Sequence, residues 1–253
     1  MRRSWLAGRP GQEVVLFHPD GPTLFELAQQ ALSSTERGYD LLAPKFDHTP
    51  FRTPDEILKP IAEWIGSFDR GVDLCCGTGA AMQALRAQAR ESLTGVDSSQ
   101  GMLAIAAGNV ADAPGEAAIS LVRADVLGWK GEGRFDLAVS FGAFGHILRQ
   151  DEPAFARVAF EALKPGGRFV FVTSTNPGPL HPGWWMAHGF NTAIRARNLV
   201  IRPAFHMYYL TFLWPQVERI LRDAGFEVSV HADVFEGRLA KALVVEARRP
   251  EGT

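Results

Sequence analysis

The chain has 253 residues, a length that suits one domain with added segments or two small domains. Hydrophobic residues make up 46% of it and charged residues 21%, and this composition excludes a disordered or fibrous protein. The formal net charge of −2 gives no global case for nucleic-acid binding.

The N-terminal part, residues 1–55, is irregular and rich in proline, with one predicted helix near 23–34. The pair Arg2-Arg3 resembles the start of an export signal, but Arg9, Pro10 and the polar residues that follow interrupt the apolar stretch that export requires. No stretch of the sequence approaches the roughly 20 apolar residues of a membrane helix. We therefore expect a soluble, unexported protein without a membrane partner.

From about residue 56 the pattern alternates between short β-rich runs and helical runs. This alternation predicts a parallel sheet covered by helices on both faces. The expected helices span 55–66, 80–89, 100–109, 151–163 and 215–224. The expected strands span 71–75, 92–96, 118–123, 135–141, 168–173, 226–234 and 240–248. Because a turn at Glu236-Gly237-Arg238 joins the last two, the predicted fold is α/β, a doubly wound, mostly parallel seven-stranded sheet with an antiparallel C-terminal hairpin.

Residues 174–214 break this rhythm and contain no clean strand, so they are interpreted as an insertion after the fifth strand. The expected organisation is an N-terminal lid segment, 1–55, and a main domain, 56–253, to which the insertion adds a second part of the lid. The only two cysteines, Cys75 and Cys76, are adjacent and cannot build a disulfide framework or a zinc set. A cytoplasmic location is therefore expected.

A glycine turn, Gly77-Thr78-Gly79, joins the first strand to a helix, and Asp97 ends the second strand. Glycine lets the backbone approach a ligand closely, and the N–H groups of a helix start face that ligand. An acid at the end of the second strand suits two ribose hydroxyls. Nicotinamide-dependent oxidoreductases share this layout, but Met82 stands at the place of the third glycine of their G-x-G-x-x-G motif. They are the weaker interpretation.

Five motifs occur in order and at regular spacing along the main domain. They are Val72–Gly79, Gly95–Leu103, Arg123–Val126, Phe135–Phe141 and Leu163–Arg168, and a further match follows at Leu221–Phe226. Together they resemble the motifs of class I S-adenosylmethionine-dependent methyltransferases of the small-molecule type. The resemblance implies a Rossmann-like fold, S-adenosylmethionine as cofactor and methyl transfer. The chain departs from the family at Cys75, where the first motif usually has a glycine near the methionine part of the cofactor.

The same resemblance implies roles for individual residues. Asp97 is expected to accept hydrogen bonds from both ribose hydroxyls, and Asp125 and Val126 to hold the adenine. Met102 is expected on the adenine face, with a place in the helix core as the alternative. The remaining cofactor-binding residues of the motifs are Asp73, Cys75, Gly77, Gly79, Ser98 and Phe141.

Two short stretches of the N-terminal segment, Gly38-Tyr39-Asp40 and Phe46-Asp47, resemble a tyrosine-containing segment of related small-molecule methyltransferases, although Phe46 replaces the usual second tyrosine. By this resemblance Tyr39 reaches the methionine end of the cofactor. A position on a helix surface is the alternative for Tyr39.

Methyl transfer from a sulfonium requires alignment of acceptor, methyl group and sulfur, and it needs a general base only where the acceptor must lose a proton. His146 is the expected catalytic residue because it follows the fourth strand at the carboxyl edge of the sheet, where ligands bind in open α/β folds. Capping of the next helix or packing beneath the cofactor is the alternative. The other lid histidines match no metal motif, so no metal is expected. They are His18, His48, His181, His188 and His206.

The insertion lies within a stretch that contains no Asp or Glu from Ala162 to Val217 but is rich in basic and aromatic residues. Such a lid suits an apolar or aromatic acceptor that carries a negative group. Trp185, Arg195, Tyr208 and Tyr209 are the expected substrate residues. The alternative is a dimer interface, so that a homodimer stays open. The basic residues of the stretch are Lys164, Arg168, Arg195, Arg197 and Arg202.

The expected function is S-adenosylmethionine-dependent methylation of a small molecule on O, N or C by in-line displacement, without a nucleic-acid partner. After the fourth strand the chain has Ser140-Phe141-Gly142-Ala143 in place of the Asn/Asp-Pro-Pro-aromatic tetrapeptide of some base methyltransferases. The alternatives are a non-catalytic binding or regulatory protein on the same fold, and methylation of a nucleic acid or a protein.

Overall fold

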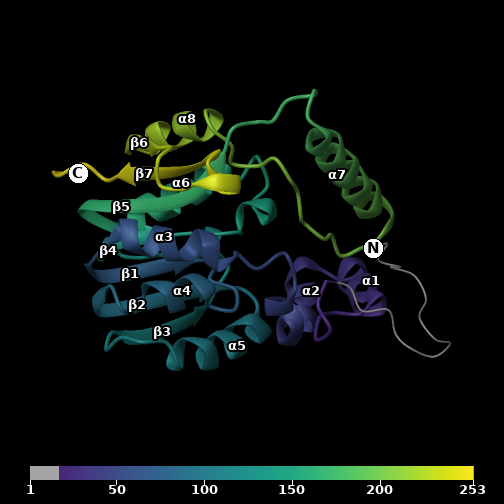
Figure 1. The fold of residues 1–253 in the computed structure, drawn as a ribbon, viewed down its shortest axis with the longest axis horizontal. Helices are drawn as coiled ribbons and strands as arrows, with labels where there is room; N and C mark the ends of the chain where they lie inside the picture. Colours follow the sequence, from purple (N-terminus) through teal and green to yellow (C-terminus); the bar gives the residue numbers. More distant parts are fainter. Residues whose placement is uncertain (1–16, 253) are drawn as a thin grey trace.

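The computed structural model describes residues 17–252, and the Arg2-Arg3 pair and the rest of residues 1–16 lie outside this range. Seven strands form one sheet in the order β3-β2-β1-β4-β5-β7-β6 (Figure 1). Strands β1 to β5 are parallel, and β7 runs antiparallel to both of its neighbours, β5 and β6. The predicted doubly wound sheet with an antiparallel C-terminal hairpin is confirmed.

The elements follow each other in the predicted β/α alternation. The strands are β1 (Phe68–Leu74), β2 (Ala89–Asp97), β3 (Ala118–Arg123), β4 (Phe135–Val139), β5 (Leu163–Ser174), β6 (Glu227–His231) and β7 (Ala242–Arg248). The α-helices are α1 (Leu24–Leu32), α2 (Thr35–Leu42), α3 (Asp55–Ile65), α4 (Ala80–Leu85), α5 (Gln100–Ala111), α6 (Glu152–Ala162), α7 (Pro182–Val200) and α8 (Gln216–Asp223). The short 3-10 turns are η1 (Ala43–His48), η2 (Val126–Gly128), η3 (Phe144–His146) and η4 (Gly237–Leu239).

Several predicted boundaries were wrong. The helix after the glycine turn ends at Leu85 rather than Ala89, because Ala89 already pairs with Phe68 as the first residue of β2. The predicted helix 23–34 is shorter, because Ser34 caps a second helix, α2. The insertion contains the long helix α7, which its glycines and the lack of an amphipathic period concealed.

Helices cover both faces of the sheet. On one face α3, α4 and α5 bury Ile61, Met82 and Leu103 against the strands. On the other face α6 and α8 bury Phe155 and Leu221. Because both faces are covered, the carboxyl edge of the parallel strands is the place left for a ligand.

The N-terminal segment and the insertion lie together beyond that edge, where Figure 1 shows α1, α2 and α7 grouped at one end of the molecule. We call residues 17–54 and 175–214 together the cap. Thr23 and Glu26 form a reciprocal capping box at the start of α1. Arg197 of α7 joins the two parts of the cap: its guanidinium donates to the carbonyl oxygens of Ala31 at 2.9 Å and Ser33 at 3.0 Å.

Replacing this arginine should loosen the cap. We expect Arg197→Ala to lower the free energy of unfolding by about 2 to 3 kcal/mol, because charge-assisted hydrogen bonds are lost and carbonyl groups at the end of α1 lose their donor. Urea denaturation measures the change. Arg195→Ala is the matched control, because Arg195 is exposed and its loss should stay within about 0.5 kcal/mol. Equal effects of the two substitutions would contradict the role given to Arg197.

Candidate active site at the carboxyl edge of the sheet

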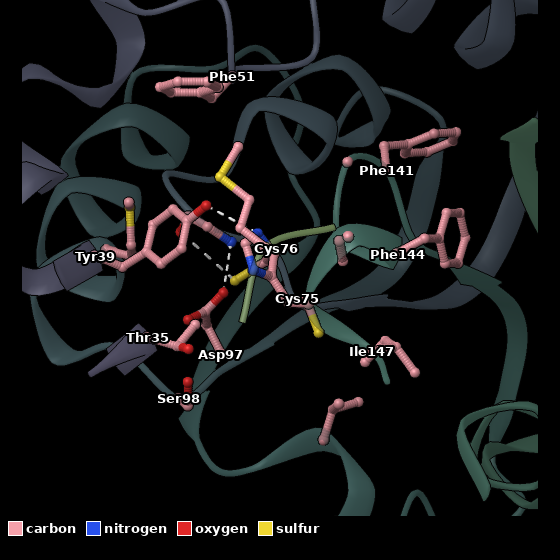
Figure 2. A pocket seen from close by; sticks show the side chains of 18 of the residues that line it. Thr35, Tyr39, Phe51, Cys75, Cys76, Asp97, Ser98, Phe141, Phe144 and Ile147 are labelled. Carbon is pink, nitrogen blue, oxygen red and sulfur yellow. Dashed lines mark hydrogen bonds between the residues drawn. The ribbon is translucent and has the colours of Figure 1, made fainter. Parts of the chain in front are cut away.

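A cavity of about 810 Å³ opens where the parallel strands end, and the cap contributes part of its wall. Figure 2 shows Tyr39 and Asp97 on one side of it, Phe141, Phe144 and Ile147 on the other, and the cysteines between them. Polar groups therefore gather on the β2 side and apolar side chains on the β4 side.

Asp97, the last residue of β2, joins two of the predicted motifs. Its Oδ2 atom accepts a hydrogen bond from the backbone N–H of Gly77 at 2.9 Å, and its Oδ1 atom accepts one from Ser99 N–H at 2.9 Å. Burial raises the pKa of Asp97, while these N–H donors act in the opposite direction. A Cβ atom at Gly77 would meet no atom within 4 Å, so the turn borders open space beside the carboxylate. This geometry leaves room for a ligand with hydroxyl groups against Asp97.

The backbone conformation at Cys75 is one that favours glycine. Its φ is 63°, in the left-handed region that L side chains adopt at a cost of about 1 to 2 kcal/mol. The chain therefore keeps the backbone shape of the motif in spite of the substitution. Burial raises the pKa values of both Cys75 and Cys76 well above the usual thiol value, so neither is a thiolate near neutral pH.

Most of the predicted cofactor residues line this cavity. They are Tyr39, Asp73, Cys75, Gly77, Asp97, Ser98, Met102, Asp125, Val126 and Phe141, and His146 joins them there. Gly79 does not line it: its φ is 80°, and a Cβ atom there would meet Val110 of α5 at 2.8 Å. The absence of a side chain at Gly79 therefore allows the turn to pack closely against α5. Asp125 uses Oδ1 to cap η2 through the N–H of Leu127 at 3.0 Å.

Two acids that the sequence analysis left without a role attach the N-terminal segment to the site. Asp40 of α2 accepts hydrogen bonds from the hydroxyl of Ser99 at 2.6 Å and the N–H of Gly101 at 2.8 Å. The approach requires a glycine, because a Cβ atom at Gly101 would lie 3.0 Å from the Cα of Asp40. Asp40 therefore connects α2 to the start of α5, directly after Asp97.

Asp47 makes the second attachment. Its carboxylate accepts hydrogen bonds from the hydroxyl of Thr78 at 2.6 Å and from the side-chain amide of Asn109 at 3.0 Å. Thr78 belongs to the glycine turn, so η1 is held against it. In both attached stretches the acid directly follows an aromatic residue, Tyr39 or Phe46. This repeated aromatic–acid pair is the sequence pattern from which the two attachments could have been predicted.

Tyr39 and His146, which both line the cavity, form a hydrogen bond to each other. The Nδ1 atom of His146 lies 2.6 Å from the carbonyl oxygen of His206, so Nδ1 carries the hydrogen and donates it. The Nε2 atom then accepts the hydrogen bond of the Tyr39 hydroxyl at 2.8 Å. Burial lowers the pKa of His146 and raises that of Tyr39. At neutral pH the pair consists of a neutral imidazole and a neutral phenol.

Of the four expected substrate residues, Tyr208 and Tyr209 of the insertion line the cavity. The structure does not bring Trp185 or Arg195 there: Trp185 is 64% exposed and donates to the carbonyl of Pro179 at 2.9 Å. Arg195 is exposed, with its guanidinium 5.8 Å from the ring centre of Tyr208. Neither residue reaches the acceptor side of the site.

The other basic residues of the stretch also lie away from the cavity. Lys164 and Arg168 belong to β5, where they pair with Asp136 and Glu246, and Arg197 holds the two parts of the cap together. Arg52 of the N-terminal segment is the only arginine among the described residues that line the cavity. It is held by Asp47 at 3.6 Å and Asp55 at 2.9 Å, so its charge is largely balanced.

Three side chains that the sequence spacing did not connect meet at the protein surface. His18, Asp20 and His48 are exposed, and their ligand atoms lie within 4.8 Å of one another. The two imidazole rings are stacked with their centres 4.7 Å apart. The nitrogen lone pairs of stacked rings lie in two nearly parallel planes, so a common metal ion would require the rings to turn.

One protein family matches the part of the chain that forms most of the parallel sheet. Residues 72–167 match a family described as a methyltransferase domain. The matched segment runs from β1 into β5 and contains the glycine turn and Asp97. The sequence has no match among curated proteins.

Solved structures similar to this chain share its fold at low sequence identity. The DhpI–SAH complex is 20% identical with a TM-score of 0.61, and the match covers 91% of this chain and 100% of that one. A Haemonchus contortus phosphoethanolamine N-methyltransferase 2 in complex with S-adenosylhomocysteine is 18% identical with a TM-score of 0.59, over 90% of this chain and 60% of that one. The N-methyltransferase NodS from Bradyrhizobium japonicum WM9 is 18% identical with a TM-score of 0.52, over 81% and 99%.

Residues 72–167 therefore match a methyltransferase domain, and the chain has the Rossmann-like fold of the solved structures to which it is similar. Within residues 17–252, no helix is long and apolar enough to cross a membrane.

Proposed function

We propose that this protein transfers the methyl group of S-adenosylmethionine to a small apolar or aromatic acceptor bound under the cap. The proposal rests on one cavity. Its wall includes both Asp97 and Gly77, where a nucleoside would bind, and the hydrogen-bonded Tyr39–His146 pair. Its volume of about 810 Å³ is within the range of roughly 300 to 1,000 Å³ of small-molecule sites. The methyltransferase neighbours crystallised with S-adenosylhomocysteine or S-adenosylmethionine support the choice of cofactor.

The donor set fits this cofactor. We assign the two ribose hydroxyls to Asp97, the adenine to Asp125 and Val126, and the amino-acid end to Gly77, and all four residues line the cavity. When bound, the cofactor supplies an electrophilic methyl group on a positively charged sulfur. The acids of the cavity, including Asp73, favour such a cation electrostatically.

The chain's own residues then position the acceptor and take its proton. The cap and the apolar wall would hold the acceptor's oxygen or nitrogen in line with the methyl group that the bound cofactor would supply. The acceptor's proton passes to the hydroxyl oxygen of Tyr39 as the hydroxyl's own proton moves to Nε2 of His146 over the 2.8 Å hydrogen bond. Since His146 is neutral, its Nε2 can act as the final base.

The charges around the cavity favour a neutral acceptor over an anionic one. The basic residues of the insertion lie elsewhere, and Arg52 is paired with two acids. The apolar wall contains Phe141, Phe144 and Ile147. We therefore propose a phenol or an aromatic amine as the acceptor class, and we test it by incubating the protein with S-adenosylmethionine and a panel of phenols, aromatic amines and aromatic acids. Mass spectrometry should detect methylated phenol or amine. Absence of any methylated product would favour a non-catalytic protein on the same fold.

Cofactor binding should release a proton. Burial and the charge of Asp97 raise the pKa of Asp73 well above its usual value, and the cationic methionine end of the cofactor should lower it again. Because the cofactor then prefers ionised Asp73, its affinity should increase as the pH rises. Calorimetric titration in two buffers of different ionisation enthalpy measures the released proton. Asp73→Asn should abolish the buffer dependence, and identical heats for the unaltered protein in both buffers would contradict this assignment.

A further inference from the structure

Helix α7 buries one side and exposes large apolar side chains on the other. On its inner side Ala187, Asn191 and Ile194 are buried, and Asn191 bonds to the backbone of Tyr209 through both its amide and its carbonyl oxygen. The outer side is exposed at helical spacing along its whole length. Its residues are Pro182, Trp185, Met186, His188, Gly189, Thr192, Ala193, Arg195, Ala196, Leu199 and Val200. We call this set the outer face of α7.

The large apolar side chains of the outer face project far into solvent. Trp185 is 64% exposed, Leu199 82% and Val200 84%. Leu180, just before the helix, is 99% exposed. Helix α1, at the same end of the molecule as α7 (Figure 1), contains Phe25, whose side chain is 71% exposed. The large apolar side chains of α7 lie toward its two ends, with small and polar exposed residues between them, so a flat apolar surface along the helix could contact both groups.

The charge on this face selects the partner. The chain has a net charge of −2, yet no Asp or Glu occurs from Ala162 to Val217, and the exposed charges in and directly after α7 are Arg195 and Arg202. A second copy of the chain would bring the same positive face against itself. A surface that is both apolar and negatively charged complements it instead.

We propose that the outer face of α7 docks the protein on the surface of an anionic phospholipid membrane. Trp185, Met186, Leu199 and Val200 enter the boundary between headgroups and acyl chains, and Arg195 and Arg202 contact the anionic headgroups. This is surface binding rather than membrane crossing. It is independent of the proposed methyl transfer, although residues 206–211, which follow α7 closely, line the cavity and would bring its opening near an apolar phase.

Sedimentation with lipid vesicles tests the proposal on the full chain. The probes are vesicles of phosphatidylcholine alone and vesicles that also contain phosphatidylglycerol. We expect binding to the mixed vesicles, weak or no binding to phosphatidylcholine alone, and weaker binding at high salt because charge contributes. The double variant Trp185→Ser/Leu199→Ser should bind at least about tenfold more weakly. Arg195→Glu/Arg202→Glu should lose the preference for anionic lipid.

The substituted side chains are exposed, so folding should be unaffected, and circular dichroism verifies this. Val230→Ser in β6 is the matched control, because Val230 is an exposed apolar residue, 40% accessible, outside the cap, and its replacement should leave vesicle binding unchanged. Failure of the unaltered protein to bind mixed vesicles would overturn the proposal. So would a dimer, found by sedimentation velocity, that the Trp185→Ser/Leu199→Ser variant abolishes while vesicle binding stays the same.

Discussion

Asp97→Ala should weaken binding of S-adenosylmethionine at least about 100-fold. The carboxylate is expected to accept hydrogen bonds from both ribose hydroxyls, and hydrogen bonds to a charged group contribute about 1.5 to 3 kcal/mol each. The same side chain also accepts the N–H groups of Gly77 and Ser99, so its loss disturbs the glycine turn as well. Calorimetric titration of the purified variant with the cofactor measures the change in affinity.

Asp97→Asn provides the control for this experiment. The amide keeps the shape and one acceptor oxygen but loses the charge, so we expect an intermediate loss of about tenfold. Urea denaturation of both variants separates a defect of the site from a defect of the fold. A cofactor affinity of Asp97→Ala equal to that of the unaltered protein would remove Asp97 from the cofactor site.

His146→Gln should lower kcat with a phenol or amine acceptor by about 100- to 1,000-fold, the range of general-base catalysis. Cofactor affinity should change little, because the contacts of His146 are with Tyr39 and with the carbonyl oxygen of His206. Tyr39→Phe should also reduce kcat. The double variant should be little worse than His146→Gln alone, since the two side chains act as one unit.

The pH dependence gives an independent test of the same pair. Burial lowers the pKa of His146 below its usual value of about 6.5, and the imidazole must be neutral to take a proton. kcat should therefore fall as the pH decreases through this lowered pKa and be level above about 6.5. The stability that the buried neutral imidazole contributes should also be full above about pH 6.5 and be lost at lower pH.

A raised KM with unchanged kcat in His146→Gln would show that His146 only packs against the ligand.

The mostly parallel sheet with its antiparallel hairpin, and the meeting of the glycine turn with Asp97, were predictable from the sequence because the motifs that specify them are local. The motif at Val72–Gly79 fixes a turn, and Asp97 follows a strand, so parallel pairing alone brings Gly77 and Asp97 together. Even the unusual Cys75 adopts the left-handed conformation for which the family uses glycine. Here each residue's role depends on its neighbours in the chain.

The acceptor side could not be predicted in the same way, because it depends on how the cap folds over the sheet. Arg197 and Arg195 are two residues apart and indistinguishable by composition, yet Arg197 binds carbonyl groups of the N-terminal segment and Arg195 is exposed. The exposed position of Trp185 on the outer face of α7 likewise depends on how the cap folds, and the local sequence does not specify it. The Tyr39–His146 hydrogen bond joins residues 107 positions apart, and no local pattern specifies such a pairing.

We expect this cavity to bind an adenosyl cofactor through Asp97 and the glycine turn. The most direct test is calorimetric titration of the ligand-free protein with S-adenosylmethionine, S-adenosylhomocysteine and NAD in parallel. We expect micromolar dissociation constants for the first two ligands and no binding of NAD. Binding of NAD, or no binding of either adenosyl ligand, would contradict this expectation.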